Sequence, residues 1–224
     1  MESKMLYRFF DVNDVDDTIV SKYYLMMSDK RKAVISSMSS GHARAVALTG
    51  EMLARSLLCR LLDAPEFSFE LLLNPNGRSA VGNYRAYLSL AACGDTVGCA
   101  VSRTPVGLCL AEKRGFSFAE AQSRFSDAEL RYIFAESGLA FARLVNLPLI
   151  TERAAATRFA SCAAVKTAYN RARGRTAGES GVEILRDPSG AVLSDPAFAV
   201  AAAGEENGLC FAVVEKKGRI LDHE

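Results

Sequence analysis

Hydrophobic residues recur at helical spacing in two long segments of the chain. In residues 42–63 apolar side chains return every three or four positions, while most charged side chains lie on other faces of the helix. The second segment, residues 151–174, is rich in alanine and ends at Gly174, and glycine commonly terminates a helix. The pattern therefore predicts two long helices, one in each half of the chain.

Capping signals predict shorter helices before each long one. Ser28 precedes a basic helical turn and is suited to be an N-cap. Ser117 with Glu120, and Ser126 with Glu129, each match the serine-x-x-glutamate capping box. We therefore expect two abutting helices within residues 117–147.

Apolar runs between the helices predict strands. The run at residues 86–102 is broken by a turn at residues 93–95, and its spacing from the strand at residues 105–112 fits a hairpin. Further short strands are expected at residues 5–10, 67–73, 182–187, 188–192 and 209–220, and a turn at residues 74–79. The order of elements predicts an α+β protein with two halves, residues 1–104 and residues 105–224.

Charge and composition exclude several classes of function. The 224 residues carry a formal net charge of +1, which argues against the broad basic surface of a sequence-independent nucleic-acid binder. No apolar run reaches the roughly 18 residues of a membrane span, and the first residues do not read as a signal peptide. The sequence thus predicts a cytoplasmic protein with no membrane partner.

The cysteines and histidines do not form a metal-binding pattern. The six cysteines include no pair separated by two residues, and the chain has two histidines, His42 and His223. This composition argues against a zinc site. We expect free thiols, most of them acting as small core residues.

Several short segments together resemble a known enzyme family. In chain order they are SDKRK, LTGEMLARSLL, NGR, SLAACGDTVGCAVSRTPVG, RFSDAE and AVKTAYNRARG, which extend from Ser28 to Gly174. They resemble the 4′-phosphopantetheinyl transferases of the larger, monomeric, surfactin-synthetase type. Members of that family transfer phosphopantetheine from coenzyme A to a serine of a carrier protein. The resemblance implies two pseudo-symmetric halves, each with a small antiparallel sheet and a long helix, that meet at a cleft.

The resemblance also implies a Mg²⁺ site, whose positions are replaced in this chain. The family holds the ion with an aspartate and a glutamate two residues apart on a strand, and with a glutamate on the long helix. Side chains at i and i+2 of a strand share one face, so both carboxylates reach one ion. These positions are Cys109, Ala111 and Thr167 here. Because Mg²⁺ prefers oxygen ligands, we expect these positions to hold no metal.

Other family positions are replaced or retained. A serine–histidine pair is replaced by Ala91 and Ala92, and an arginine of the first long helix by Val46. The resemblance implies that Lys166 and Arg171 offset phosphate charge during catalysis, and that the residues which bind coenzyme A are Lys30, Arg31, Arg78 and Lys166. The alternative for these basic residues is that they form the solvated faces of helices and turns.

Two residues of the predicted strand at 105–112 have alternative interpretations. Cys109 is either a buried small hydrophobe, which we favour, or a reactive thiol in a basic pocket. Glu112 is either an exposed acid at the strand end, which we favour, or a weak catalytic candidate that a β-bulge turns toward the metal positions. Asp95 is interpreted as a turn residue.

Three hypotheses for function follow. The first is a catalytically degenerate phosphopantetheinyl-transferase-like protein that retains binding of coenzyme A or of an acyl or peptidyl carrier protein. The second is an active transferase with a displaced Mg²⁺ site that uses Glu112 and Asp95. The third is a non-enzymatic module that docks a protein through the cleft or the helix at residues 42–63.

Overall fold

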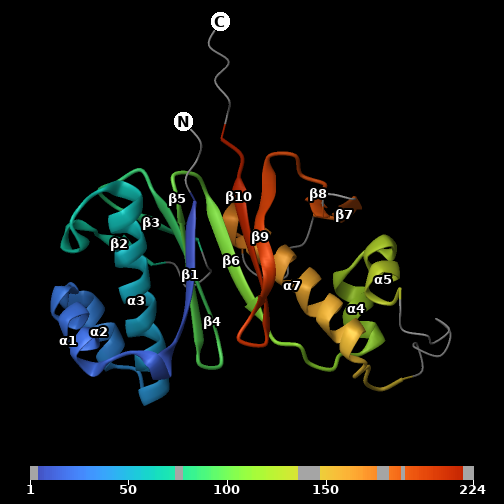
Figure 1. The fold of residues 1–224 in the computed structure, drawn as a ribbon, viewed down its shortest axis with the longest axis horizontal. Coiled ribbons are helices and arrows are strands. Elements are labelled where there is room, and N and C mark those ends of the chain that lie inside the picture. Colours follow the sequence, from blue (N-terminus) through green and yellow to red (C-terminus); the bar gives the residue numbers. More distant parts are fainter. Residues whose placement is uncertain (1–4, 74–77, 136–146, 176–181, 188–189, 219–224) are drawn as a thin grey trace, which may run out of the picture.

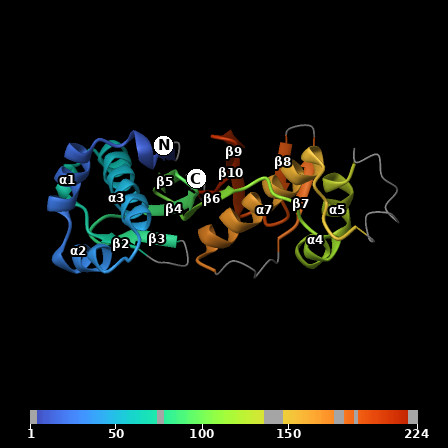
Figure 2. The same ribbon diagram turned by 90° about the horizontal axis from the view of Figure 1, so that it is seen from below.

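The computed structural model describes residues 5–73, 78–135, 147–175, 182–187 and 190–218. Figure 1 shows four layers side by side: helices, a five-stranded sheet, a three-stranded sheet, and helices again. Both sheets are antiparallel, so the chain has the α+β class that the sequence predicts. The view from below in Figure 2 separates the same two groups of helices.

The first series of elements builds the five-stranded sheet and its helices. It comprises β1 (Leu6–Asp11), the 3-10 helix η1 (Val12–Asp14), α1 (Asp17–Met26), α2 (Asp29–Ser36), α3 (Gly41–Leu62), the 3-10 helix η2 (Glu66–Ser68), β2 (Leu71–Leu72), β3 (Arg78–Val81), β4 (Tyr87–Cys93) and β5 (Thr96–Ser102).

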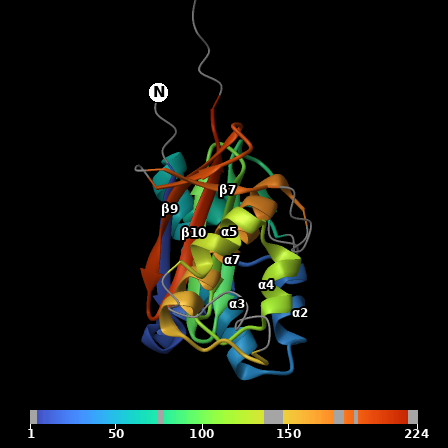
Figure 3. The same cartoon turned by 90° about the vertical axis from the view of Figure 1, so that its right-hand side faces the viewer.

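The second series builds the three-stranded sheet, a two-stranded sheet and the helices that cover them. It comprises β6 (Val106–Ala111), α4 (Phe118–Arg124), α5 (Asp127–Ile133), α7 (Arg153–Arg173), β7 (Ile184–Asp187), β8 (Gly190–Leu193), β9 (Phe198–Glu206) and β10 (Leu209–Lys216). Figure 3 shows α4, α5 and α7 from the side on which they cover the strands.

The two series follow one order. Each begins with a strand, continues through short helices to a long helix, and ends with short strands and a hairpin of long strands. In each, the first strand pairs with the last, β1 with β5 and β6 with β10, and the last pairs with the strand before it. The chain therefore passes twice through one α+β arrangement, with β5 ending at Ser102 and β6 beginning at Val106.

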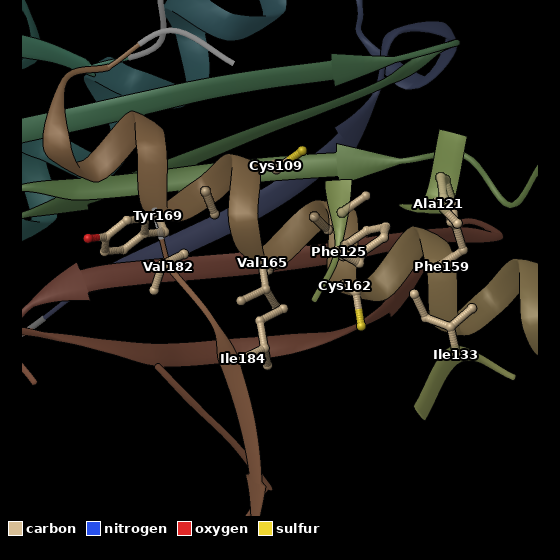
Figure 4. Close-up of a cluster of buried hydrophobic side chains, with 14 of the residues drawn as sticks. Cys109, Ala121, Phe125, Ile133, Phe159, Cys162, Val165, Tyr169, Val182 and Ile184 are labelled. Atoms are coloured by element: carbon tan, nitrogen blue, oxygen red, sulfur yellow. The ribbon is translucent and has the colours of Figure 1, made fainter. Parts of the chain in front are cut away.

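Three hydrophobic clusters fill the spaces between the four layers. One lies between α3 and the five-stranded sheet, and a second surrounds α7. The third joins the two sheets and includes Leu108, Leu110 and Phe211. Because side chains alternate along a strand, β6 directs Leu108 and Leu110 to the neighbouring sheet and Cys109 to α7. In Figure 4, Val165 of α7 extends toward Ile184 at the start of β7.

The predicted helix ends are confirmed by the capping contacts. The Ser28 side chain accepts a hydrogen bond from the Arg31 amide, and the Ser117 side chain accepts one from the Glu120 amide. Ser126 and Glu129 form a complete capping box. Gly174 ends α7 in the left-handed conformation, with φ of 72°.

Several predictions about strands were wrong. The strand after residue 104 does not form a hairpin with the preceding run: β6 pairs with β10, and the hairpin consists of β4 and β5. Residues 67–73 are mostly not a strand, because η2 precedes the two-residue β2. The alanine-rich β9 was missed. Of the predicted turn at 74–79, residues 74–77 lie outside the described residues, as do 176–181 of the loop after α7.

Gly107 provides a stability test of the packing between β6 and α7. A Cβ atom at this position would lie 1.9 Å from the carbonyl oxygen of Ala168 and 2.6 Å from the amide nitrogen of Ala172, both on the α7 backbone. We expect Gly107→Ala to lower the free energy of unfolding by at least about 3 kcal/mol, the upper end of the usual cost of overpacking. Urea denaturation measures this change.

The matched control is Gly218→Ala, where nothing lies within 4 Å of the added Cβ. This variant should unfold at the urea concentration of the wild type. Equal midpoints for the Gly107→Ala variant and the wild type would contradict the close approach of β6 to α7.

Candidate functional site

Residues from two distant segments of the sequence line one pocket. Cys109 and Ala111 lie on β6, Thr167 lies on α7, and all three border a pocket of about 220 Å³ between these elements. The i, i+2 spacing on the strand places Cys109 and Ala111 on the α7 side, and the close approach at Gly107 brings the helix to them. We call this space the Cys109 pocket.

The donor set of the Cys109 pocket does not fit Mg²⁺. Its floor offers a thiol, a methyl group and a hydroxyl group where three carboxylates would be needed. Glu112 borders the pocket but is exposed beyond the end of β6, and the β6–β10 register continues without a bulge that would turn it inward. Within the part of the chain that the structure describes, no group of three His, Cys, Asp or Glu side chains could hold a metal ion.

The Cys109 thiol is buried among positively charged neighbours. Only 7% of the residue is exposed, and burial raises the pKa of the Cys109 thiol. Arg171, a hydrogen bond with Thr167, and Arg124 act in the opposite direction on this pKa. The thiol therefore stays protonated near neutral pH, and the arginines around it remain uncompensated by a thiolate.

Lys166 is a buried structural cation and not part of a solvated helix face. Its Nζ lies 2.6 Å from Oε2 of Glu129 and donates to the carbonyl oxygen of Arg124 at 2.9 Å. The Glu129 side chain, 1% exposed, also accepts hydrogen bonds from the amides of Ser126 and Ile184. The contact ties α7 to the start of α5, so the Lys166 ammonium group is directed away from the Cys109 pocket, whose lining does not include Lys166.

Arg171 joins the two sheets where β4 approaches β6. Its Nη1 donates to the carbonyl oxygen of Leu108 on β6 at 2.6 Å and to that of Leu90 on β4 at 3.3 Å. The amide of Leu108 in turn donates to Oγ of Ser89 at 3.0 Å. Side chains thus satisfy the Leu108 backbone groups on the edge of β6 that faces away from β10.

Lys30 and Arg31 lie apart from this pocket. Arg31 contacts the buried carboxylate of Glu51 on α3 with an Nε–Oε2 distance of 3.3 Å. Lys30 is exposed on α2. The structure therefore does not gather Lys30, Arg31 and Lys166 into one site. The backbone of Arg78 in β3 pairs with that of Ser89 in β4, and the Arg78 side chain is outside the part of the chain that the structure describes.

A second, more apolar pocket lies beside α3. It has a volume of about 350 Å³ and is bordered by Cys93 and by Val46 and Ala92, two positions at which the resemblance implies other residues. We call it the Val46 pocket. Cys93 is close enough to Glu112 for that carboxylate to act on its pKa, so the two pockets lie near each other along the β4–β6 junction.

His42 and Asp95 lie together at the edge of the Val46 pocket. His42 borders the pocket, and its Nδ1 lies 3.4 Å from Oδ1 of Asp95 in the β4–β5 turn. Both side chains are about half exposed. Asp95 does not border the Cys109 pocket, so it cannot supply a carboxylate there.

Sequence reasoning missed a group of charged residues at the Cys109 pocket. Arg114 and Arg124 both border it, and both contact the carboxylate of Glu120 on α4. Glu120 and Arg124 are four residues apart on α4, so helical spacing could have indicated that contact. Arg114 lies in a loop, where no periodic pattern marks its contact with Glu120 before the fold is known.

Comparison with protein-family models and with curated proteins finds no match for this sequence. None of the helices that the structure describes is both long enough and apolar enough to cross a bilayer. The geometry of the two pockets therefore carries the functional argument.

The Lys166–Glu129 contact gives a prediction about stability. Lys166→Met would leave the Glu129 carboxylate buried without its cation, so we expect a loss of about 3–5 kcal/mol in the free energy of unfolding. Chemical denaturation measures the loss. Lys22→Met, which removes a cation that is 60% exposed and 3.8 Å from Glu66, should cost no more than about 1 kcal/mol. Equal effects of the two substitutions would refute a buried pair.

The cysteines give a prediction about pH. All six are free thiols, and burial together with Glu112 raises the pKa of Cys93. A raised pKa lowers the thiolate fraction at neutral pH, so iodoacetamide should modify Cys93 more slowly than a free cysteine. The pH at which the rate is half-maximal should lie above the roughly 8.5 of an ordinary thiol.

Mass spectrometry of timed samples follows this reaction at each cysteine. Glu112→Gln should speed modification of Cys93 because it removes a negative charge that opposes the thiolate. Cys109 should react only after unfolding. Rapid labelling of native Cys109 would show that its thiol is more accessible than its 7% exposure indicates.

Proposed function

We propose that this protein is a phosphopantetheinyl-transferase-like binding protein, catalytically degenerate, that binds coenzyme A without transferring its phosphopantetheine arm. The observation that carries the proposal is the convergence of Cys109, Ala111 and Thr167 on one pocket. The resemblance implies that these positions are neighbours, and the geometry supports that relation although the side chains have changed.

The arrangement of the fold supports the same proposal. The chain passes twice through one α+β order, and a long helix covers the outer face of each sheet. Ala92 and Val46, which replace a histidine and an arginine of the family pattern, also converge on one pocket. Replaced positions thus gather in two neighbouring pockets instead of scattering over the surface.

The chemistry of the Cys109 pocket argues for binding over transfer. Attack on the pyrophosphate of coenzyme A requires neutralisation of its charge, which the family achieves with Mg²⁺. The thiol, methyl and hydroxyl groups present here are unsuited to this ion. The alternative of a displaced Mg²⁺ site would need Glu112 and Asp95 to act together, but Asp95 contacts His42 outside this pocket.

Calorimetry combined with a transfer assay tests the proposal. Coenzyme A should bind with 1:1 stoichiometry, whereas incubation with coenzyme A, Mg²⁺ and several apo-carrier proteins should leave the carrier mass unchanged. Ala92→Asp should weaken coenzyme A binding at least about 10-fold, because the added carboxylate would repel the phosphate groups of a ligand that extends from the Cys109 pocket to the neighbouring Val46 pocket. Ala201→Asp, at another exposed strand alanine, is the matched control.

Other outcomes discriminate the alternatives. Modification of a carrier serine, abolished by Glu112→Ala, would establish an active transferase and refute degeneracy. Capture of a carrier protein with no response to coenzyme A would favour the docking module. If the protein neither binds coenzyme A nor captures a carrier protein, the proposed function is refuted.

A further inference from the structure

We infer that the Cys109 pocket is a metal-free oxyanion site in which Arg114 and Arg124 bind a phosphoryl group, and that Glu120 occupies this arginine pair when no ligand is bound. This inference rests on the proposed function for the location of the ligand and goes beyond it in the means of binding. The positive charge that a Mg²⁺ ion would bring is supplied instead by guanidinium groups.

The charges at the pocket favour an anion. Arg114 and Arg124 border it, and Arg124 and Arg171 are close enough to act on the Cys109 thiol. Glu112 is the acidic residue of the lining, and it is exposed to solvent at the rim. Since the buried Cys109 thiol remains protonated, the side chains of Cys109, Ala111 and Thr167 contribute no opposing negative charge.

Arg124 is held in place before any ligand arrives. Its guanidinium carbon lies 5.5 Å from the ring centre of Phe159, and Phe159 stacks on Phe116 at 4.1 Å. The Arg124 carbonyl oxygen accepts a hydrogen bond from Lys166. A guanidinium group fixed on an aromatic face loses little freedom when it binds a phosphate, which favours affinity.

The Glu120 carboxylate contacts both arginines, as an anionic ligand would. Arg114 contacts both carboxylate oxygens, with Nη2–Oε1 at 2.6 Å and Nη1–Oε2 at 3.3 Å. Arg124 contacts the same Oε1 from 3.6 Å through Nη1. Counting Arg171 and the exposed Glu112 as well, three guanidinium groups face two carboxylates, which leaves one positive charge. Because the Arg114 and Arg124 side chains are 53% and 40% exposed, a solvent-borne oxyanion can reach them.

The size of the pocket defines the class of ligand. About 220 Å³ is less than the roughly 300–1,000 Å³ of sites that enclose a whole drug-sized molecule. The pocket therefore suits a phosphoryl or pyrophosphoryl group, and the remainder of a larger ligand would lie outside it. Arginine pairs recognise such groups through charge-assisted, bidentate hydrogen bonds.

Titration of the full chain with inorganic pyrophosphate in EDTA tests the inference. The wild type should bind, and Arg124→Gln should weaken binding about 10-fold or more, the loss expected for a charged hydrogen bond. Glu120→Gln should tighten binding about 2- to 5-fold, because it frees both arginines from a partly exposed carboxylate. Arg131→Gln, at an exposed arginine of α5, removes the same charge and should leave affinity unchanged.

A second variant guards against a folding defect. If Arg124→Gln lowers the melting temperature, Arg124→Lys keeps the charge but loses the paired donors, and it should still bind several-fold more weakly than the wild type. No pyrophosphate binding at millimolar concentration, binding that requires Mg²⁺, or weaker binding by Glu120→Gln would each overturn the inference.

Coenzyme A in the same buffer separates this inference from the proposed function. Binding of pyrophosphate but not of coenzyme A would retain the oxyanion site and refute the proposed function. Binding of coenzyme A with equal affinity by the wild type and by Arg124→Gln would retain the proposed function and refute the arginine site. If Arg124→Gln binds neither pyrophosphate nor coenzyme A, while Arg131→Gln binds both as the wild type does, the oxyanion site and the proposed function are both supported.

Discussion

The close approach of α7 to β6 at Gly107 determines where the candidate site can exist. With no side chain at this position, the helix backbone lies so near the strand that a Cβ would overlap the Ala168 carbonyl oxygen. This distance places Thr167 beside Cys109 and lets Arg171 reach past β6 to a carbonyl of β4. A wider separation would open the pocket to solvent and break the bridge between the sheets.

Each half also contains an ion pair between the first turn of a short helix and the long helix, and the charges of the two pairs are exchanged. In the second half, Glu129 at the first turn of α5 contacts Lys166 on the long helix. In the first half, Arg31 at the first turn of α2 contacts Glu51 on the long helix. An acid suits a helix start and a base does not, so Arg31 depends more strongly on its buried partner. The position of the pair is repeated although the residues are not, which explains why comparison of residues within the chain reveals no repeat.

The sequence contains enough information for the helices and for much of the strand content. Ser28, Ser126 and Gly174 act locally, through contacts with residues a few positions away, so their capping roles are readable before the fold is known. The strand β9 was missed because its alanines have low β propensity and offer no clear alternation. Pairing of β6 with β10 joins distant parts of the chain, and a short apolar run carries no signal for its partner.

The sequence indicated which residues border the candidate site, but it did not indicate which charged side chains are available there. The resemblance brings together Cys109, Ala111 and Thr167, and these residues do border one pocket. It also assigned Lys166 to phosphate, whereas the buried carboxylate of Glu129 lies 2.6 Å from the Lys166 ammonium group. A cation on a helix is available to a ligand only if no buried acid from another element holds it, as Glu129 holds Lys166. That condition depends on tertiary packing, which the spacing of residues along α7 does not reveal.

The protonation state of Cys109 connects the packing of α7 against β6 to the preference of the Cys109 pocket for an anion. A thiolate at that position would balance one of the nearby guanidinium groups and leave a site with little net attraction for an anion. Burial opposes the thiolate more strongly than Arg171 and Arg124 favour it, so the pKa of Cys109 stays raised. The three positions at which the resemblance implies acids are neutral here, while Arg114 and Arg124 border the same space. A pocket that contains arginines and a protonated thiol favours an anionic ligand over a cation, and this preference is set by the side chains and not by the course of the backbone.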